Sequence, residues 1–210
     1  MPVIALINQK GGCGKSTNSC HIAHWLMTQG HSVAVIDSDS QQSVTRWLKS
    51  MESPIQSHIM GDPDELVEKI PAIAEDHDFV VVDGAAGITE TTRCILLRAD
   101  LVIVPVQPSG LDLSSANDAL RLVKQAQSVR NGLPKVKILI SRAVKGTRLY
   151  DEAMDFLKDK PLFKTVIHQR QVVADCFGQA AVVWTLPKSK ATQDAIEEFK
   201  ALCSEIMEAL

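Results

Sequence analysis

The chain has 210 residues, of which 45% are apolar and 22% are charged, and its formal net charge is −3. This composition is ordinary for a globular protein, and a chain of this length can bury one sizeable core. No apolar stretch approaches the roughly 18 residues of a membrane span, and residues 3–7 are too short for a signal peptide. Five cysteines without a Cys-x-x-Cys pair argue against a disulfide framework or a zinc site. We therefore expect a cytoplasmic enzyme with one domain over residues 1–210.

Short apolar runs and helical patterns alternate along the chain. The apolar runs are mostly β-branched, as in strands buried on both faces of a parallel sheet, and cover residues 3–7, 32–36, 79–82, 101–106 and 136–140. Helical spacing is found at 15–29, 42–49, 63–75, 89–98, 114–131, 148–158 and 192–210. Residues 164–190 give mixed strand and loop signals. The alternation predicts an α/β fold with a three-layer, doubly wound, mostly parallel sheet.

Residues 10–17, Lys-Gly-Gly-Cys-Gly-Lys-Ser-Thr, lie between the first predicted strand and the first predicted helix. Such a turn forms a cradle for phosphate, because glycines let backbone N–H groups approach an anion and the helix N-terminus adds partial positive charge. Lys15 can reach the β- and γ-phosphates, and the Ser16 hydroxyl suits Mg²⁺. We therefore expect a nucleoside triphosphate as ligand. The loop residues expected to bind it are Gly11, Gly12, Cys13, Gly14, Lys15, Ser16 and Thr17.

A second lysine, Lys10, opens this loop, and Gln9 stands where the strict pattern has glycine. Taken alone, Lys10 could be a solvated loop lysine. The sequence Lys-Gly-Gly-x-Gly-Lys-Ser, however, resembles the deviant Walker A motif of one group of P-loop NTPases. In proteins with this motif the first lysine reaches across a dimer to the nucleotide of the partner subunit. The resemblance therefore implies that Lys10 and Lys15 are both catalytic.

Aspartates follow two of the predicted strands, at the sheet edge where ligands bind in such folds. Asp37 and Asp39 can hold waters in a Mg²⁺ shell or position an attacking water, although an isolated Asp-x-Asp is more often a turn or a helix cap. Asp83 ends an apolar strand, as in a Walker B element. We expect Ser16, Asp37 and Asp83 at the metal and Asp39 as a catalytic residue. Residues 84–87, Gly-Ala-Ala-Gly, are small enough to act as a switch near the γ-phosphate.

Together with Val-Pro-Val-Gln-Pro-Ser at 104–109, these motifs resemble the ParA family of partition ATPases, and most closely its short ParF-like members. The resemblance implies ATP and Mg²⁺ as cofactors, weak ATP hydrolysis and a sandwich homodimer that forms with ATP. It also implies non-specific DNA binding by that dimer and stimulation by a ParB-like or other adaptor protein on the cargo, which is a plasmid, a chromosome or another body. The expected location is the cytoplasm, in association with the nucleoid.

The resemblance also assigns residues outside the phosphate loop. The segment 106–112, and with it Pro108, lies near the nucleotide and the dimer interface in the family, and Arg142 matches a residue close to the adenine. Ser40 replaces the usual proline without removing a chemical group. Because the phosphate loop begins within ten residues of Met1, we expect no N-terminal DNA-binding domain.

Basic residues gather in one part of the sequence. Residues 135–190 contain eleven Lys and Arg against five Asp and Glu. A solvated face is one interpretation, and a patch that tracks DNA phosphates and becomes continuous on dimerisation is the other. The basic residues are Lys135, Lys137, Arg142, Lys145, Arg148, Lys158, Lys160, Lys164, Arg170, Lys188 and Lys190.

Two other functions are compatible with a phosphate loop of this kind. A MinD-like membrane ATPase needs a basic amphipathic C-terminal helix, whereas residues 192–210 carry five acids and one base, so no membrane partner is expected. A metallocluster ATPase needs paired cysteines at the dimer axis, and Cys94 has no near neighbour in the sequence. Both alternatives are less consistent with the motifs than a partition ATPase.

Overall fold

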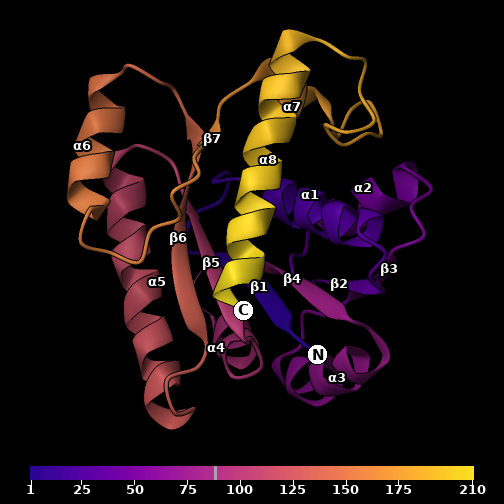
Figure 1. Ribbon diagram of the computed structural model, residues 1–210. Coiled ribbons are helices and arrows are strands. Elements are labelled where there is room, and N and C mark those ends of the chain that lie inside the picture. The colour runs from indigo at the N-terminus through magenta and orange to yellow at the C-terminus, as the bar shows by residue number, and fades with distance from the viewer. Residues whose placement is uncertain (88) are drawn as a thin grey trace.

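The computed structural model describes residues 1–87 and 89–210. Its centre is a seven-stranded sheet in the order β3-β2-β4-β1-β5-β6-β7, in which every paired neighbour is parallel (Figure 1). The strands are β1 (Val3–Asn8), β2 (Val33–Asp37), β3 (Gln56–Ile59), β4 (Phe79–Ala86), β5 (Leu101–Val106), β6 (Lys135–Ala143) and β7 (Ile167–His168). Each connection between parallel strands crosses over through a helix or a longer segment, as the alternating sequence pattern predicts.

Helices cover both faces of the sheet. They are α1 (Lys15–Thr28), α2 (Ser43–Ser50), α3 (Pro63–Asp76), α4 (Glu90–Leu96), α5 (Gly110–Val129), α6 (Arg148–Leu157), α7 (Gln171–Asp175) and α8 (Lys190–Ala209). One core cluster joins the sheet to α3, α4, α5 and α6, and the other joins it to α1, α2 and α8. The three-layer α/β fold is thus confirmed.

The central strand β1 shows why these residues form a buried strand. Val3, Ala5 and Ile7 pack in the core beside α3 to α6, whereas Ile4 and Leu6 pack in the core beside α1 and α8. Successive side chains of a strand point to opposite faces, so a strand covered on both sides is apolar at nearly every position. This arrangement explains the continuous apolar run in the sequence.

Some boundaries differ from the expected ones. β3 was not expected, because its sequence Gln-Ser-His-Ile lies at the sheet edge and lacks an apolar run. β7 is only two residues long and falls in the segment with mixed signals. α5 begins at Gly110 rather than at residue 114, because Ser109 caps it by accepting a hydrogen bond from the backbone N–H of Asp112.

The parallel sheet brings several loops to one edge. The phosphate loop follows β1, Asp37 ends β2, and Asp83 lies near the end of β4, so all three lie at the carboxyl edge. No helix within residues 1–87 and 89–210 is both long and apolar enough to cross a membrane.

Candidate nucleotide-binding site

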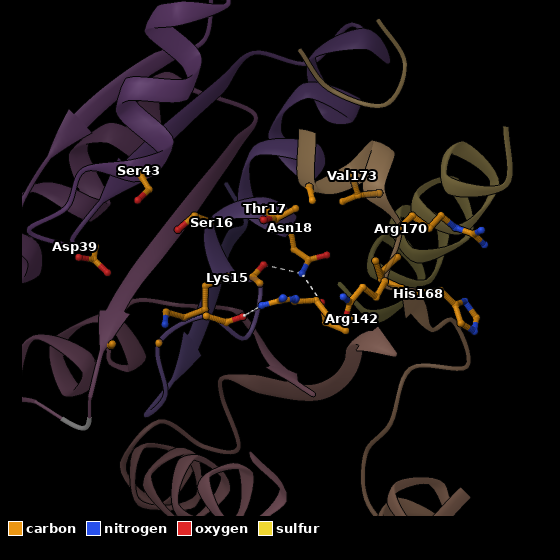
Figure 2. A pocket seen from close by; sticks show the side chains of 18 of the residues that line it. Lys15, Ser16, Thr17, Asn18, Asp39, Ser43, Arg142, His168, Arg170 and Val173 are labelled. Atoms are coloured by element: carbon orange, nitrogen blue, oxygen red, sulfur yellow. Dashed lines mark hydrogen bonds between the residues drawn. The ribbon is translucent and has the colours of Figure 1, made fainter. Parts of the chain in front are cut away.

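A pocket of about 620 Å³ opens at the carboxyl edge of the sheet. Its walls are the phosphate loop, the first turn of α1, the loop after β2, the end of β6 and the β7–α7 segment (Figure 2). Ligands of parallel α/β sheets bind at this edge. Of the residues expected to contact a nucleotide or metal, those that line the pocket are Gly11, Gly12, Gly14, Lys15, Ser16, Thr17, Asp39 and Arg142. The expected site residues outside its lining are Lys10, Cys13, Asp37, Asp83 and Pro108.

Two glycines give the phosphate loop its shape. Gly12 and Gly14 have φ angles of 78° and 94°, in the left-handed region that side chains rarely adopt. A Cβ at Gly14 would also lie 2.8 Å from the Ser141 hydroxyl oxygen. Gly14 precedes α1, and no side chain caps that helix. The first N–H groups of α1 are therefore available to an anion.

Lys15 is held inside the loop. Its side chain is 6% exposed, and its Nζ donates a hydrogen bond to the carbonyl oxygen of Lys10 at 3.1 Å. The Cys13 thiol donates to the same carbonyl at 3.4 Å, and burial raises the pKa of that thiol. The buried Cys13 side chain thus supports the loop on the side away from the pocket. The hydrogen bond to Lys10 keeps the Lys15 ammonium within the loop, at the pocket.

Lys10 makes an ion pair within its own subunit. Its Nζ lies 3.4 Å from Oδ2 of Asp112, and the Ser109 hydroxyl donates to the same carboxylate oxygen. The backbone N–H of Lys10 donates to Asn8 Oδ1 at 3.3 Å. The ion pair directs the ammonium toward α5, outside the lining of the pocket. A contact of Lys10 with a partner's nucleotide stays a prediction.

Asp83 is buried behind Ser16. Its two carboxylate oxygens accept hydrogen bonds from the hydroxyls of Ser16 at 2.7 Å and Ser19 at 2.9 Å. The pKa of Asp83 is raised to about 7, chiefly by burial and to a smaller extent by the nearby charge of Asp37. The two serine hydroxyls and Lys15 act in the opposite direction. Asp83 is therefore placed to orient the Ser16 hydroxyl.

The two aspartates of the Asp-x-Asp pair have different surroundings. Asp37 is fully buried, and its oxygens accept from the backbone N–H groups of Asp39 at 3.2 Å and Thr45 at 2.9 Å. Asp39 lines the pocket and accepts from the backbone N–H of Gln41 at 2.9 Å. Asp37 thus shapes the loop, and Asp39 presents its carboxylate to the pocket.

The donor set suits a hard cation bound together with phosphate. Within residues 1–87 and 89–210, no group of three or more His, Cys, Asp or Glu side chains could hold a metal ion. Mg²⁺ commonly takes only one or two protein oxygens, and substrate phosphates and water complete its shell. Ser16 and Asp39 line the pocket and supply oxygens of that kind. Asp37 and Asp83 lie outside the lining and both oxygens of each accept hydrogen bonds, so their direct contact with a metal stays a prediction.

Two segments far away in the sequence contact the phosphate loop. Arg142, at the end of β6, has a φ of 56°, and its guanidinium donates to the Gly12 carbonyl at 2.8 Å. The Gln107 side chain donates to the same carbonyl at 2.8 Å. Pro108 itself is half-buried and lies outside the lining of the pocket. The segment after β5 therefore reaches the loop through Gln107.

The β7–α7 wall of the pocket was not assigned from the sequence. His168 and Arg170 line the pocket, and both contact Glu198 of α8, at 2.8 Å and 2.5 Å. Residues 164–190 give mixed strand and loop signals, so the sequence assigned no role to this wall. The strand and the helix of this wall are only two and five residues long, so they show no periodic pattern in the sequence.

The basic residues of 135–190 fall into two groups, those with contacts inside the protein and those on its surface. Arg170 is tied to Glu198, Arg142 to the phosphate loop, and Lys135 to the backbone carbonyls of Ala209 and Leu210. These three side chains therefore serve internal contacts. Others remain on the surface, and the exposed ones include Lys145, Lys158, Lys164, Lys188 and Lys190.

Comparison with known proteins places this geometry in a family. Residues 4–181 match the family model described as the CobQ/CobB/MinD/ParA nucleotide binding domain. The chain is 26% identical over 212 residues to the maintenance of carboxysome distribution protein A of Halothiobacillus neapolitanus, covering 97% of this chain and 95% of that protein.

Solved structures share the fold. The apo McdA of Cyanothece superposes with a TM-score of 0.79 at 14% identity, with 99% of each chain covered. MinD of Pyrococcus horikoshii, solved with Mg-ADP, superposes with a TM-score of 0.78 at 20% identity, covering 98% of this chain and 95% of that chain. At these identities the likeness establishes the fold alone.

Proposed function

Because the chain belongs to the CobQ/CobB/MinD/ParA nucleotide-binding family, we propose that it is a partition or positioning ATPase that binds ATP in the pocket at the carboxyl edge of the sheet. One observation carries the proposal. The uncapped start of α1, the buried Lys15 and the Ser16–Asp83 hydrogen bond converge on one end of the pocket. They supply N–H donors, a cation and an oriented hydroxyl, which are the groups that a triphosphate with Mg²⁺ requires.

Each residue of the loop has a part in this proposal. Lys15 neutralises charge on the β- and γ-phosphates, and the N–H groups of residues 11–17 hold their oxygens. Ser16, held by Asp83, would coordinate Mg²⁺, which when bound neutralises charge that develops during phosphoryl transfer. Asp39, facing the pocket, orients the attacking water. ATP is hydrolysed to ADP and phosphate.

Dimerisation would follow from the position of Lys10. Two phosphate loops that face each other repel through their triphosphates unless cations lie between them. Lys10 supplies such a cation once its ammonium leaves Asp112 and contacts the partner's triphosphate. A diphosphate carries less negative charge and attracts the ammonium less strongly. ATP would thus favour a homodimer and ADP would release it.

DNA binding is the next step of the proposal. The exposed lysines of 145–190 contact DNA phosphates, and two copies in a dimer engage more phosphates than one. The binding is non-specific, since phosphate contacts carry no sequence information directly. A ParB-like or other adaptor couples this cycle to cargo, in the cytoplasm on the nucleoid, with residues 1–210 acting as one domain.

The ATPase assignment is tested with Lys15→Ala, with Lys124→Ala on the exposed surface of α5 as the matched control. We expect Lys15→Ala to lose ATP binding in calorimetry, and Lys124→Ala to bind like the wild type. Full ATPase activity in Lys15→Ala would refute the assignment. A DNA mobility shift with ATP and with ADP, at two salt concentrations, tests the DNA-binding step separately.

A further inference from the structure

Asn18 lies in the first turn of α1 and has its orientation fixed. The residue is 1% exposed and lines the pocket. Its amide nitrogen donates to the Gly14 carbonyl at 2.7 Å and is 3.3 Å from the Ser141 hydroxyl, and Figure 2 draws both contacts as dashed lines. Only the nitrogen of the amide can donate to a carbonyl, so these contacts determine which way the amide lies.

The other end of the same amide has no partner. Asn18 Oδ1 is buried and accepts no hydrogen bond from residues 1–87 or 89–210. It points away from the two contacts of the nitrogen, toward the side of the pocket where Val173 and Arg170 lie (Figure 2). A buried acceptor without a partner destabilises the fold, and native proteins contain few of them. A donor from a bound ligand would remove this cost.

We propose that Asn18 Oδ1 accepts a hydrogen bond from the nucleoside part of the bound nucleotide, which makes Asn18 a specificity-determining residue. This inference rests on the proposed ATP-binding function. Ionised phosphate oxygens accept hydrogen bonds but cannot donate them, so they cannot satisfy Oδ1. In ATP the available donors are the 6-amino group of adenine and the 2′- and 3′-hydroxyls of ribose. Asn18 therefore reads a part of the ligand that the phosphate loop does not contact.

Access to Oδ1 requires a small movement, because the atom is covered in this structure. Helix α7 forms part of the same wall through Val173 and Ala174, and none of its residues is fully buried. Elements with few buried contacts open at low cost in free energy. A slight shift of α7 would admit the donor and place it between Asn18 and the β7–α7 wall.

The test measures binding of ATP and of analogues that each lack one donor. These are 2′-deoxy-ATP, 3′-deoxy-ATP and purine riboside 5′-triphosphate, which lacks the 6-amino group, and inorganic tripolyphosphate is the probe without a nucleoside. We expect wild-type protein to bind one of the three analogues roughly tenfold more weakly than ATP, as for the loss of one hydrogen bond to a neutral group. The analogue affected identifies the source of the donor.

The variant Asn18→Ala completes the experiment. We expect it to bind ATP as weakly as wild-type protein binds the affected analogue, and to bind tripolyphosphate like the wild type. Equal weakening of every nucleotide and of tripolyphosphate would mean that Asn18 only supports the loop, and the proposal would be wrong. Wild-type binding of all three analogues as tightly as ATP would also overturn it, without any variant. If wild-type protein binds neither ATP nor tripolyphosphate, the nucleotide-binding function itself fails.

Discussion

Lys10 and Asp112, which are 102 residues apart in the sequence, form an ion pair at 3.4 Å beside the phosphate loop. Asp112 lies in the first turn of α5 and is nearly buried, whereas the Lys10 side chain keeps 35% of its surface exposed. One oxygen of Asp112 has no hydrogen-bond partner among the described residues. The pair holds within one subunit the lysine that we propose to act across the dimer.

This pair predicts the effect of Asp112→Asn. Removing the negative charge releases Lys10, so the ATP-dependent dimer should form at a lower protein concentration. A partly exposed ion pair is worth at most about 1 kcal/mol, which corresponds to a shift of about two- to fivefold. Sedimentation with a non-hydrolysable ATP analogue measures this shift.

The matched control for this change is Asp118→Asn on the same helix, where Asp118 lies 4.0 Å from the exposed Arg121. It should leave dimerisation unchanged.

Lys10→Ala should keep ATP binding through Lys15 but lose the dimer and the DNA binding. A Lys10→Ala protein that still dimerises with ATP would make Lys10 an ordinary loop lysine.

Asp39→Ala should slow hydrolysis and retain ATP binding. Its carboxylate faces the pocket and holds no distant part of the fold, whereas both oxygens of Asp37 hold backbone N–H groups. Loss of a group that positions the attacking water should reduce the rate roughly 100-fold and leave the protein as an ATP-bound dimer. Phosphate release and size-exclusion chromatography with ATP measure the two effects, with Glu208→Ala on the exposed side of α8 as control. Normal hydrolysis by Asp39→Ala would remove Asp39 from the mechanism.

Gly84→Ala should destabilise the fold near the proposed switch. A Cβ at Gly84 would lie 2.6 Å from the backbone oxygen of Leu6 and 3.1 Å from Cγ2 of Ile7. Because β1 and β4 are neighbouring strands, this clash moves backbone, and we expect a loss of about 1–3 kcal/mol in the free energy of unfolding. Denaturant unfolding checks it against Gly61→Ala, where a Cβ meets no atom within 4 Å. Equal stability of the two variants would show that β1 and β4 shift apart at this point without a loss in the free energy of unfolding.

His21 predicts a pH dependence of stability. Its ring is fully buried, Nδ1 lies 2.7 Å from the Thr17 carbonyl, Nε2 accepts from the backbone N–H of Val183 at 3.3 Å, and the ring stacks on Phe199. The pKa of His21 is lowered from 6.5 to about 4, chiefly by burial; the nearby His24 acts in the same direction, and the hydrogen bond with the Thr17 carbonyl acts in the opposite one. The unfolded chain therefore binds this proton more readily than the folded one, so stability falls as the pH drops from 6.5 to 4.

The shift from 6.5 to about 4 corresponds to roughly 3 kcal/mol. Unfolding measured at several pH values for the wild type and for His21→Gln, whose amide cannot be protonated in this range, isolates the contribution. Groups that titrate in both proteins cancel in the difference. The stability advantage of the wild type over His21→Gln should shrink by that amount between pH 7 and pH 4. A difference that is constant with pH would contradict the neutral, buried state of His21.

The sequence by itself determined the position of the phosphate loop and most of the architecture. The phosphate loop is recognised from the consecutive residues Lys10 to Thr17 alone. The buried strands of a parallel sheet are recognised because they are apolar at nearly every position. Both signals are local, and no knowledge of the tertiary contacts is needed to use them. The Asp39 carboxylate and the Ser16 hydroxyl were likewise expected at this edge, because strand ends of a parallel sheet converge there.

Only the tertiary structure decided which groups meet. The order of the strands brings α5 beside the phosphate loop and so pairs Lys10 with Asp112, and it brings Ser141 to Asn18 across 123 residues. Asp37 and Asp39 have the same side chain in the same motif. Both oxygens of Asp37 accept hydrogen bonds from backbone N–H groups, whereas Asp39 lines the pocket. Hydrogen bonding and burial depend on neighbours that are distant in the sequence, so no local pattern could assign these roles. The edge strands β3 and β7 were missed for a related reason, since pairing with a neighbour rather than apolar periodicity holds them in the sheet.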